Sequence, residues 1–507
     1  MSEVVFPLGA DGRRSSTEFG RAVVADALRA ADPVAAAAAE RETDWRKGYL
    51  RHFRSLVTAG LGNGYETAAA GLESVHRRMS IEVSDPATPP PPTFTVSGEG
   101  KAERELLVPY GKEVLRGDSL QRQLDAWVSR GVIEASCAEM VRSVAANPDW
   151  LDLSDQRLVV LGAGAELGPL PPVLAWGGTV VGVDLPRPEL WERVAAAARR
   201  GAGTLIAPGK SVSDAGIDLL TALPTATQWL LGIEGRLVLG NYVYAPGAAY
   251  PLLSAAVDAL GNHISRERPE TALAFLATPT DTFAVPGNAV AQAAERYRNR
   301  SAAARLAQLM SGGKLLEPHF PDARIGNGDP ARSDLSDIHP MDPRAADPAI
   351  SDLRDAGPGI AKLRAADPEG AGPGIADSLV PQQGPNYALA KRIQRWRASV
   401  ARHSGIDVSF SVAPPTATRS VTRNRLLAAA YAGAHLFGIE VFAPATSNRL
   451  MAALLVHQLR NPRPAAAQAW QDETVGAAHG GLWRVGYLPR TALGLAAVRG
   501  LPAALSH

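Results

Sequence analysis

Disulfide bonds, long apolar runs and an excess of charge are all missing from this 507-residue chain. Its single cysteine, Cys137, excludes a disulfide within the chain and is typical of a protein in a reducing compartment. No stretch of eighteen apolar residues occurs, and the first residues lack the basic-then-apolar order of a secretory signal. We therefore expect a cytoplasmic protein without a membrane-spanning helix.

The charges nearly cancel, with 52 Lys and Arg against 51 Asp and Glu. The formal net charge of +1 gives no general attraction to nucleic acid or to an anionic membrane. The ten histidines show neither His-x-x-x-His nor Cys/His spacing, so the sequence predicts no metal site. We expect a small-molecule substrate, no nucleic-acid or membrane partner, and a homo-oligomer.

The chain is too long for one compact core, and its composition changes along its length. Residues 1–150 are mainly helical in pattern and include a proline-rich linker at 86–98, which we expect to be extended and unpacked. Residues 151–460 alternate between apolar runs and helical segments, and 461–507 form a C-terminal extension. Residues 322–380 are rich in Pro, Asp, Gly and Ala, which predicts a flexible insertion.

Short apolar runs separated by helical segments predict an α/β fold, namely a doubly wound, Rossmann-like parallel sheet. The expected strands cover residues 158–161, 179–183, 204–207, 236–241, 272–277 and 408–412. Ligands of such sheets bind beyond the carboxyl ends of the strands. The turns that follow these strands are therefore where we expect the functional residues.

A glycine turn follows the first of these strands, with Gly162, Gly164 and Gly168, and Asp184 ends the second strand. Glycines let a backbone approach a pyrophosphate, and an acid at this place can bond ribose hydroxyls. The layout predicts a nucleotide site, although a plain crossover without a ligand has the same outline. Glu166 lies inside the turn, where a carboxylate repels phosphate unless it points to solvent.

A tyrosine and a lysine four residues apart, Tyr387 and Lys391, lie on one face of a predicted helix at 387–402. A nearby ammonium stabilises a phenolate, so the pair can exchange a proton with an alcohol or carbonyl oxygen. The same helix carries Arg392, Arg395 and Arg402, from which we expect a solvated or subunit-facing surface.

In this order, the features resemble the short-chain dehydrogenase/reductase family over residues 157–460. The resemblance implies an NAD(P)-dependent oxidoreductase acting on a small alcohol or carbonyl. It places the acid/base on Tyr387, the supporting lysine on Lys391 and the substrate-orienting hydroxyl on Thr278, with Thr280 as an alternative. The family's relay asparagine falls nearest to Asn262.

The resemblance also implies cofactor contacts in loops that follow the strands. They fall on Gly162, Gly164, Gly168, Asp184, Asn241, Lys391, Pro414, Thr416 and Thr418. Asp184 favours NAD over NADP because a carboxylate repels a 2′-phosphate. Two other functions stay open: an S-adenosylmethionine-dependent methyltransferase, and a dehydrogenase-like scaffold used for lyase, dehydratase or isomerase chemistry or for binding alone.

Overall fold

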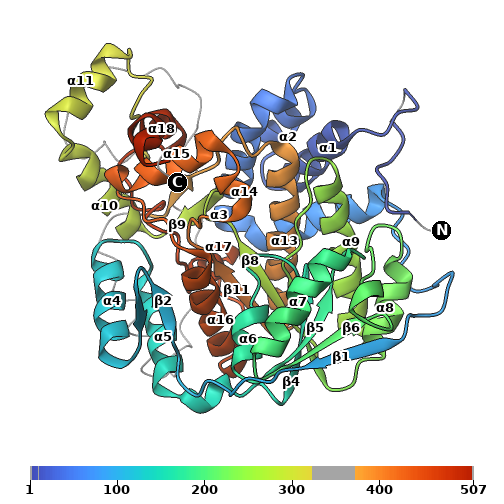
Figure 1. The fold of residues 1–507 in the computed structure, drawn as a ribbon. Helices are drawn as coiled ribbons and strands as arrows, with labels where there is room; N and C mark the ends of the chain where they lie inside the picture. Colours follow the sequence, from blue (N-terminus) through green and yellow to red (C-terminus); the bar gives the residue numbers. More distant parts are fainter. Residues whose placement is uncertain (1–2, 10, 322–371, 505–507) are drawn as a thin grey trace, which may run out of the picture.

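A seven-stranded sheet forms the centre of the protein in the computed structural model, which describes residues 3–9, 11–321 and 372–504 (Figure 1). The strand order is β1-β6-β5-β4-β7-β8-β11, in which β1 is antiparallel to β6 and the other neighbours are parallel. The parallel strands are β4 (Gln156–Leu161), β5 (Thr179–Val183), β6 (Thr204–Pro208), β7 (Arg236–Asn241), β8 (Ala272–Ala277) and β11 (Val408–Val412). The chain therefore has an α/β fold with a mostly parallel sheet, as the sequence predicts.

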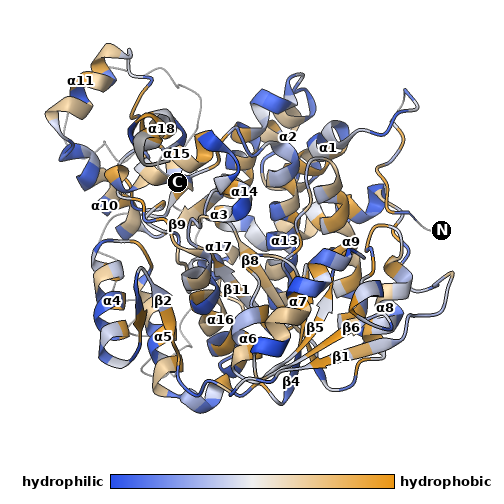
Figure 2. Ribbon diagram, viewed as in Figure 1, coloured by the Kyte–Doolittle hydropathy of each residue, from blue (hydrophilic) through white to orange (hydrophobic). Residues whose placement is uncertain are grey.

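Helices cover both faces of this sheet because its strands are apolar on both sides. In β4, Val159 and Leu161 pack into one core, while Leu158 and Val160 pack into the other. The first face is covered by α8 (Leu223–Leu231), α9 (Ala249–Glu267) and α13 (Pro385–His403). The second face is covered by α6 (Leu170–Ala175), α7 (Pro188–Arg200) and α16 (Pro444–Arg460). In Figure 2 the central strands are mainly hydrophobic and the outward sides of the helices are hydrophilic.

The N-terminal helices belong to the first of these two cores. They are α1 (Ser16–Leu28), α2 (Pro33–Glu40) and α3 (Trp45–Arg78). Side chains of α1 and α3, such as Phe19 and Phe53, share that core with α9 and α13. The long helix α3 is interrupted at Asn63, whose backbone is not helical and which lies between Gly62 and Gly64.

The expected linker at 86–98 differs from the structure in its second half. Residues Thr93–Ser97 form β1, which pairs along its whole length with β6. The residues alternate between exposed and less exposed positions, as in an edge strand with one covered face. The proline-rich stretch thus leads directly into the sheet. A hairpin of β2 (Val108–Tyr110) and β3 (Glu113–Leu115) precedes α4 (Gly117–Ser129) and α5 (Ala135–Ala146).

The expected flexible insertion also contains a strand near its end. Residues 322–371 lie outside the described residues, but β10 (Gly374–Asp377) pairs with β9 (Thr282–Val285), which follows β8. Ala376 and Asp377 are buried there, so this part of the expected insertion is packed.

The remaining helices lie mostly in the C-terminal part of the chain. They are α10 (Gly287–Arg298), α11 (Ala302–Met310), α14 (Arg419–Thr422), α15 (Arg425–Gly433), α17 (Ala469–Thr474) and α18 (Pro489–Ala504). Figure 1 shows α15 and α18 beside each other, away from the centre of the sheet. No helix among the described residues is long and apolar enough to cross a membrane.

Candidate functional site

The glycine turn after β4 is fixed mainly by its own backbone. Gly162 has a φ of 89°, which favours glycine, and a Cβ there would lie 2.8 Å from the carbonyl oxygen of Tyr242. The N–H groups of Gly162 and Ala163 both donate to the carbonyl of Val183. This first glycine therefore serves the close approach of the turn to β5 and to the segment after β7.

Asp184, at the end of β5, is tied to the same turn. Its Oδ2 accepts a hydrogen bond of 2.8 Å from the N–H of Gly164, and its Oδ1 accepts one of 2.8 Å from the N–H of Leu185. Burial raises the pKa of this carboxyl, and the two backbone N–H groups act in the opposite direction. The predicted ribose ligand is thus held at the functional edge, although both of its oxygens already accept one hydrogen bond.

Glu166 does not point freely into solvent but binds the loop that follows β11. Its Oε2 accepts a hydrogen bond of 2.7 Å from the N–H of Arg419, and its Oε1 lies 3.0 Å from the Nε of the same residue. The helix that begins nearby, α6, is only six residues long, and two of its first three residues are Pro171 and Pro172. Proline has no N–H, so the start of this helix offers few donors to an anion.

The tyrosine of the predicted pair lies in the first turn of α13 and is partly buried. Burial raises the pKa of Tyr387 to about 12, while the charge of Lys391 and a hydrogen bond with the Thr278 hydroxyl act in the opposite direction. The Thr278 hydroxyl also lies 2.9 Å from that of Thr280, to which Gln383 donates. The structure thus brings Thr278, Tyr387 and Lys391 together, with Thr280 turned toward the loop before α13.

The amino group of Lys391 is held by the end of β8 and by its own helix. It donates to the carbonyl of Leu276 at 3.3 Å and to Oε1 of Gln394 at 3.2 Å. Gln394 is buried and donates in turn to the hydroxyl of Ser254 on α9, at 3.4 Å. Burial lowers the pKa of Lys391, and the phenol of Tyr387 acts in the opposite direction.

A small cavity lies between the glycine turn, the ends of β8 and β11, and α16. Leu167 of the glycine turn and Pro169 directly after it line this cavity together with Leu276, whose carbonyl accepts from Lys391. Tyr242 and residues of β11 and α16 complete its wall. Lys391 does not line this cavity and reaches its wall only through the backbone carbonyl of Leu276.

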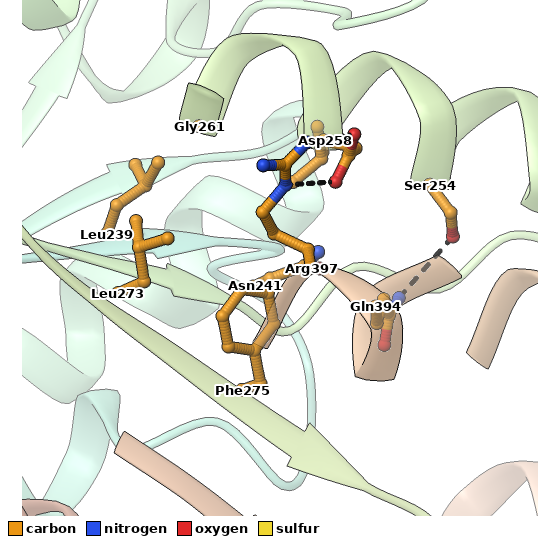
Figure 3. A pocket seen from close by; sticks show the side chains of 10 residues that line it. Leu239, Asn241, Ser254, Asp258, Gly261, Leu273, Phe275, Gln394 and Arg397 are labelled. Atoms are coloured by element: carbon orange, nitrogen blue, oxygen red, sulfur yellow. Dashed lines mark hydrogen bonds and ion pairs between the residues drawn. The ribbon is translucent and has the colours of Figure 1, made fainter. Parts of the chain in front are cut away.

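A second small cavity lies on the other face of the sheet, between α9 and α13 (Figure 3). Asn241 lines it together with Ser254 and Gln394. The Asn241 side chain is buried, and its Oδ1 has no hydrogen-bond partner among the described residues. The structure thus places Asn241, a predicted cofactor ligand, inside the protein, in the cavity that is also lined by Gln394, the partner of Lys391.

Asn262 is not part of the group around Tyr387. Its Oδ1 accepts a 3.4 Å hydrogen bond from Arg397, which also binds the buried Asp258 at 2.6 and 2.9 Å. His76 of α3 binds the same carboxylate. The side-chain amide that contacts the amino group of Lys391 is that of Gln394, a residue of α13 itself. Lys391 and Gln394 are three residues apart, a spacing that places both side chains on one face of a helix, so the sequence contains a local signal for their contact.

The loop after β11 is packed against the start of α16. Thr416 is buried, and its hydroxyl interacts with the carbonyl of Pro414 and with Ser447 at the start of α16. Thr418 is only partly buried, and it precedes α14. Of the predicted ligands in this loop, Thr418 is therefore the more accessible, and Thr416 connects the loop to α16.

Buried ion pairs fix α13, contrary to the solvated surface expected from its arginines. Arg395 is 2% exposed and binds Asp281 at 2.7 Å and Glu473 at 2.6 and 2.7 Å. Arg392, also buried, pairs with Asp281 at 3.3 Å, and Arg402 donates to the carbonyl of Val408. The carboxylates lie more than 70 positions away along the chain, so the helix pattern alone contains no sign of them.

Within the part of the chain that the structure describes, no group of His, Cys, Asp and Glu side chains is arranged to hold a metal ion. No protein-family model, curated protein or solved structure matches this chain at a significant level. The geometry and the sequence pattern therefore carry the functional argument.

Proposed function

We propose that this protein is an NAD(P)-dependent oxidoreductase that acts on a small alcohol or carbonyl compound. The observation that carries the proposal is the cluster of Thr278, Tyr387 and Lys391 at the carboxyl ends of parallel strands. Leu276, whose carbonyl accepts from Lys391, lines a small cavity together with Leu167 of the glycine turn. A hydroxyl, a phenol and an ammonium at such an edge can orient an oxygen and exchange a proton with it.

The order of the parallel strands supports a Rossmann-like fold for this chemistry. Numbered along the chain, the six parallel strands follow one another in space as 3-2-1-4-5-6. Dinucleotide-binding sheets have this order, and their ligands bind where it reverses, beside the first and fourth strands. In this chain those strands are β4 and β7, and the glycine turn follows β4.

The residues at this edge fit a nicotinamide dinucleotide. Asp184 would bond the adenosine ribose, the glycine turn would face the pyrophosphate, and Lys391 would bond the nicotinamide ribose. The unused N–H groups support this fit, because those of Glu166 and Leu167 make no hydrogen bond with the described residues. When bound, the cofactor would supply or accept the hydride.

The proton would pass through Tyr387 in the proposed reaction. Thr278 would donate a hydrogen bond to the substrate oxygen and hold it near the phenol. Lys391 would stabilise the phenolate, because its ammonium already lowers the pKa of the phenol against the effect of burial. Tyr250, which is 1% exposed and has its ring centroid 5.6 Å from that of Tyr387, would keep water away from the phenol.

The test is the thermal stability of the purified protein with NAD, NADP or S-adenosylmethionine. We expect NAD or NADP to raise the melting temperature, because a ligand that binds only the folded state stabilises it. The reduced form of the same cofactor should then be consumed when short-chain ketones or aldehydes are added. Stabilisation by S-adenosylmethionine alone would overturn the proposal in favour of a methyltransferase. Dinucleotide binding without turnover across a broad carbonyl panel would favour a lyase, an isomerase or a binding protein.

A further inference from the structure

The glycine turn contains an internal carboxylate at the place where a pyrophosphate is expected. Glu166 receives two donors from one residue, the backbone N–H and the guanidinium of Arg419. A phosphate oxygen accepts the same kinds of hydrogen bond from arginine and from backbone N–H groups. The carboxylate thus has the contacts that an anionic ligand would need.

The segment that carries Arg419 has no acid of its own. Residues 413–439 contain Arg419, Arg423 and Arg425 and not one Asp or Glu. The carboxylate that binds Arg419 belongs instead to Glu166, 253 positions earlier in the chain, at the edge where the parallel strands have their carboxyl ends. The segment of residues 413–439, which follows β11, is therefore a source of positive charge beside the glycine turn.

Stability alone gives little reason for this pair. The side chain of Arg419 is 68% exposed and that of Glu166 29% exposed. Ion pairs in such solvated positions contribute little to the free energy of unfolding. The short, proline-rich start of α6 leaves the turn with few donors, so a cation from elsewhere is needed to bind a pyrophosphate.

We propose that Arg419 is the cation that binds the cofactor's pyrophosphate. In the absence of cofactor, Glu166 binds this guanidinium, and the pyrophosphate of the dinucleotide then takes the place of the Glu166 carboxylate. The inference rests on the proposed function. The N–H groups of Glu166 and Leu167 in the turn, which have no partner among the described residues, complete the anion site. Glu166 thus competes with the cofactor and lowers its apparent affinity.

The experiment is calorimetric titration of the full-length protein with NAD, ADP and adenosine at low and moderate salt. Removing the competing carboxylate in Glu166→Gln should tighten NAD and ADP binding by about tenfold, equal to about 1.4 kcal/mol. Arg419→Gln should weaken both by about tenfold, and Arg419→Lys should restore part of the loss. Adenosine has no phosphate, so its affinity should stay the same in all variants.

Matched controls separate the local contact from a general change of charge. Glu189 and Arg423 are exposed residues near the same edge, and Glu189→Gln and Arg423→Gln should change NAD affinity by less than about twofold. Equal loss of affinity in Glu166→Gln and Arg419→Gln would show that the pair only supports the loop, and unchanged affinity in both would show that it is irrelevant. Either result overturns the inference while the proposed function stands. If neither the wild type nor Glu166→Gln binds any dinucleotide, the proposed function fails as well.

Discussion

The two ends of the candidate site are held in opposite ways. At the catalytic end, Tyr387 and Lys391 lie on a helix that buried ion pairs fasten to β9 and α17, through Arg395 with Asp281 and Glu473. At the phosphate end, the contact between Glu166 and Arg419 is solvated. A proton donor must keep its position within a fraction of an ångström, whereas a group that exchanges one anion for another must be free to move. The difference in burial therefore matches the difference between the two tasks that we propose for these ends.

The largest change should come from cutting the buried anchor of α13. Arg395→Leu leaves Asp281 and Glu473 in the interior without their main counter-charge, and we expect a loss of about 3–5 kcal/mol in the free energy of unfolding. Denaturation by urea measures it. Arg77→Gln is the matched control, because that arginine is 56% exposed and pairs at the surface, and it should cost less than about 1 kcal/mol. A similar small loss in Arg395→Leu would remove the contrast between the two ends.

Tyr387→Phe tests the catalytic end directly. We expect turnover to fall by about 10³-fold while NAD affinity changes by less than about twofold, because only the proton-transferring hydroxyl is removed. Initial rates of cofactor oxidation and calorimetry measure the two quantities. Tyr244→Phe, at a ring that is 62% exposed, should leave the rate nearly unchanged. Full activity in Tyr387→Phe would refute the assignment.

Lys391→Met should reduce turnover by roughly 10²-fold and raise the pKa of Tyr387 above its value of about 12, because the ammonium is what opposes burial. A spectroscopic titration of tyrosinate measures that change.

The Lys391→Met variant should also alter the dependence of stability on pH. Burial lowers the pKa of Lys391 in the folded state, so protonation favours the unfolded chain. The wild type should gain stability as pH rises from the folded-state pKa to that of an unfolded lysine, and the variant should lack this gain.

The smallest effect should be that of Glu166→Gln on stability. The pair is solvated, so the free energy of unfolding should fall by less than about 1 kcal/mol in the absence of nucleotide. Chemical denaturation with and without NAD separates this effect from the expected gain in affinity. A loss as large as that of Arg395→Leu would show that the phosphate end is also a fixed part of the scaffold.

The sequence alone predicts the central strands well. Strands 179–183, 236–241, 272–277 and 408–412 have the same bounds in the structure, because apolar runs that are buried on both faces are easy to recognise. The short strands β1 and β10 are not predicted from the sequence in this way. Each is stabilised by pairing with a strand far away in the chain, and neither has a long apolar run.

The site divides along the same line. The spacing of Tyr387 and Lys391 and the place of Thr278 after a strand are local signals, and the structure brings these three together. The roles of Asn262 and Asn241 were predicted from their order along the chain, but the direction of a side chain decides its contacts. Asn262 binds Arg397, and the Asn241 side chain is buried in the interior. The contact of Glu166 with Arg419 joins residues 253 positions apart, and no local pattern contains it.

The strand β1 has a consequence for how the protein behaves in concentrated solution. Without it, β6 would end the sheet with an unpaired row of backbone groups, which is a template for aggregation. Residues Thr93–Ser97 cover that row with a five-residue strand whose residues Thr93, Thr95 and Ser97 are polar and exposed. Prolines directly before it cannot donate to a further strand. This short, polar strand, with prolines directly before it, therefore offers a weaker template for edge-to-edge association than the edge of β6 would.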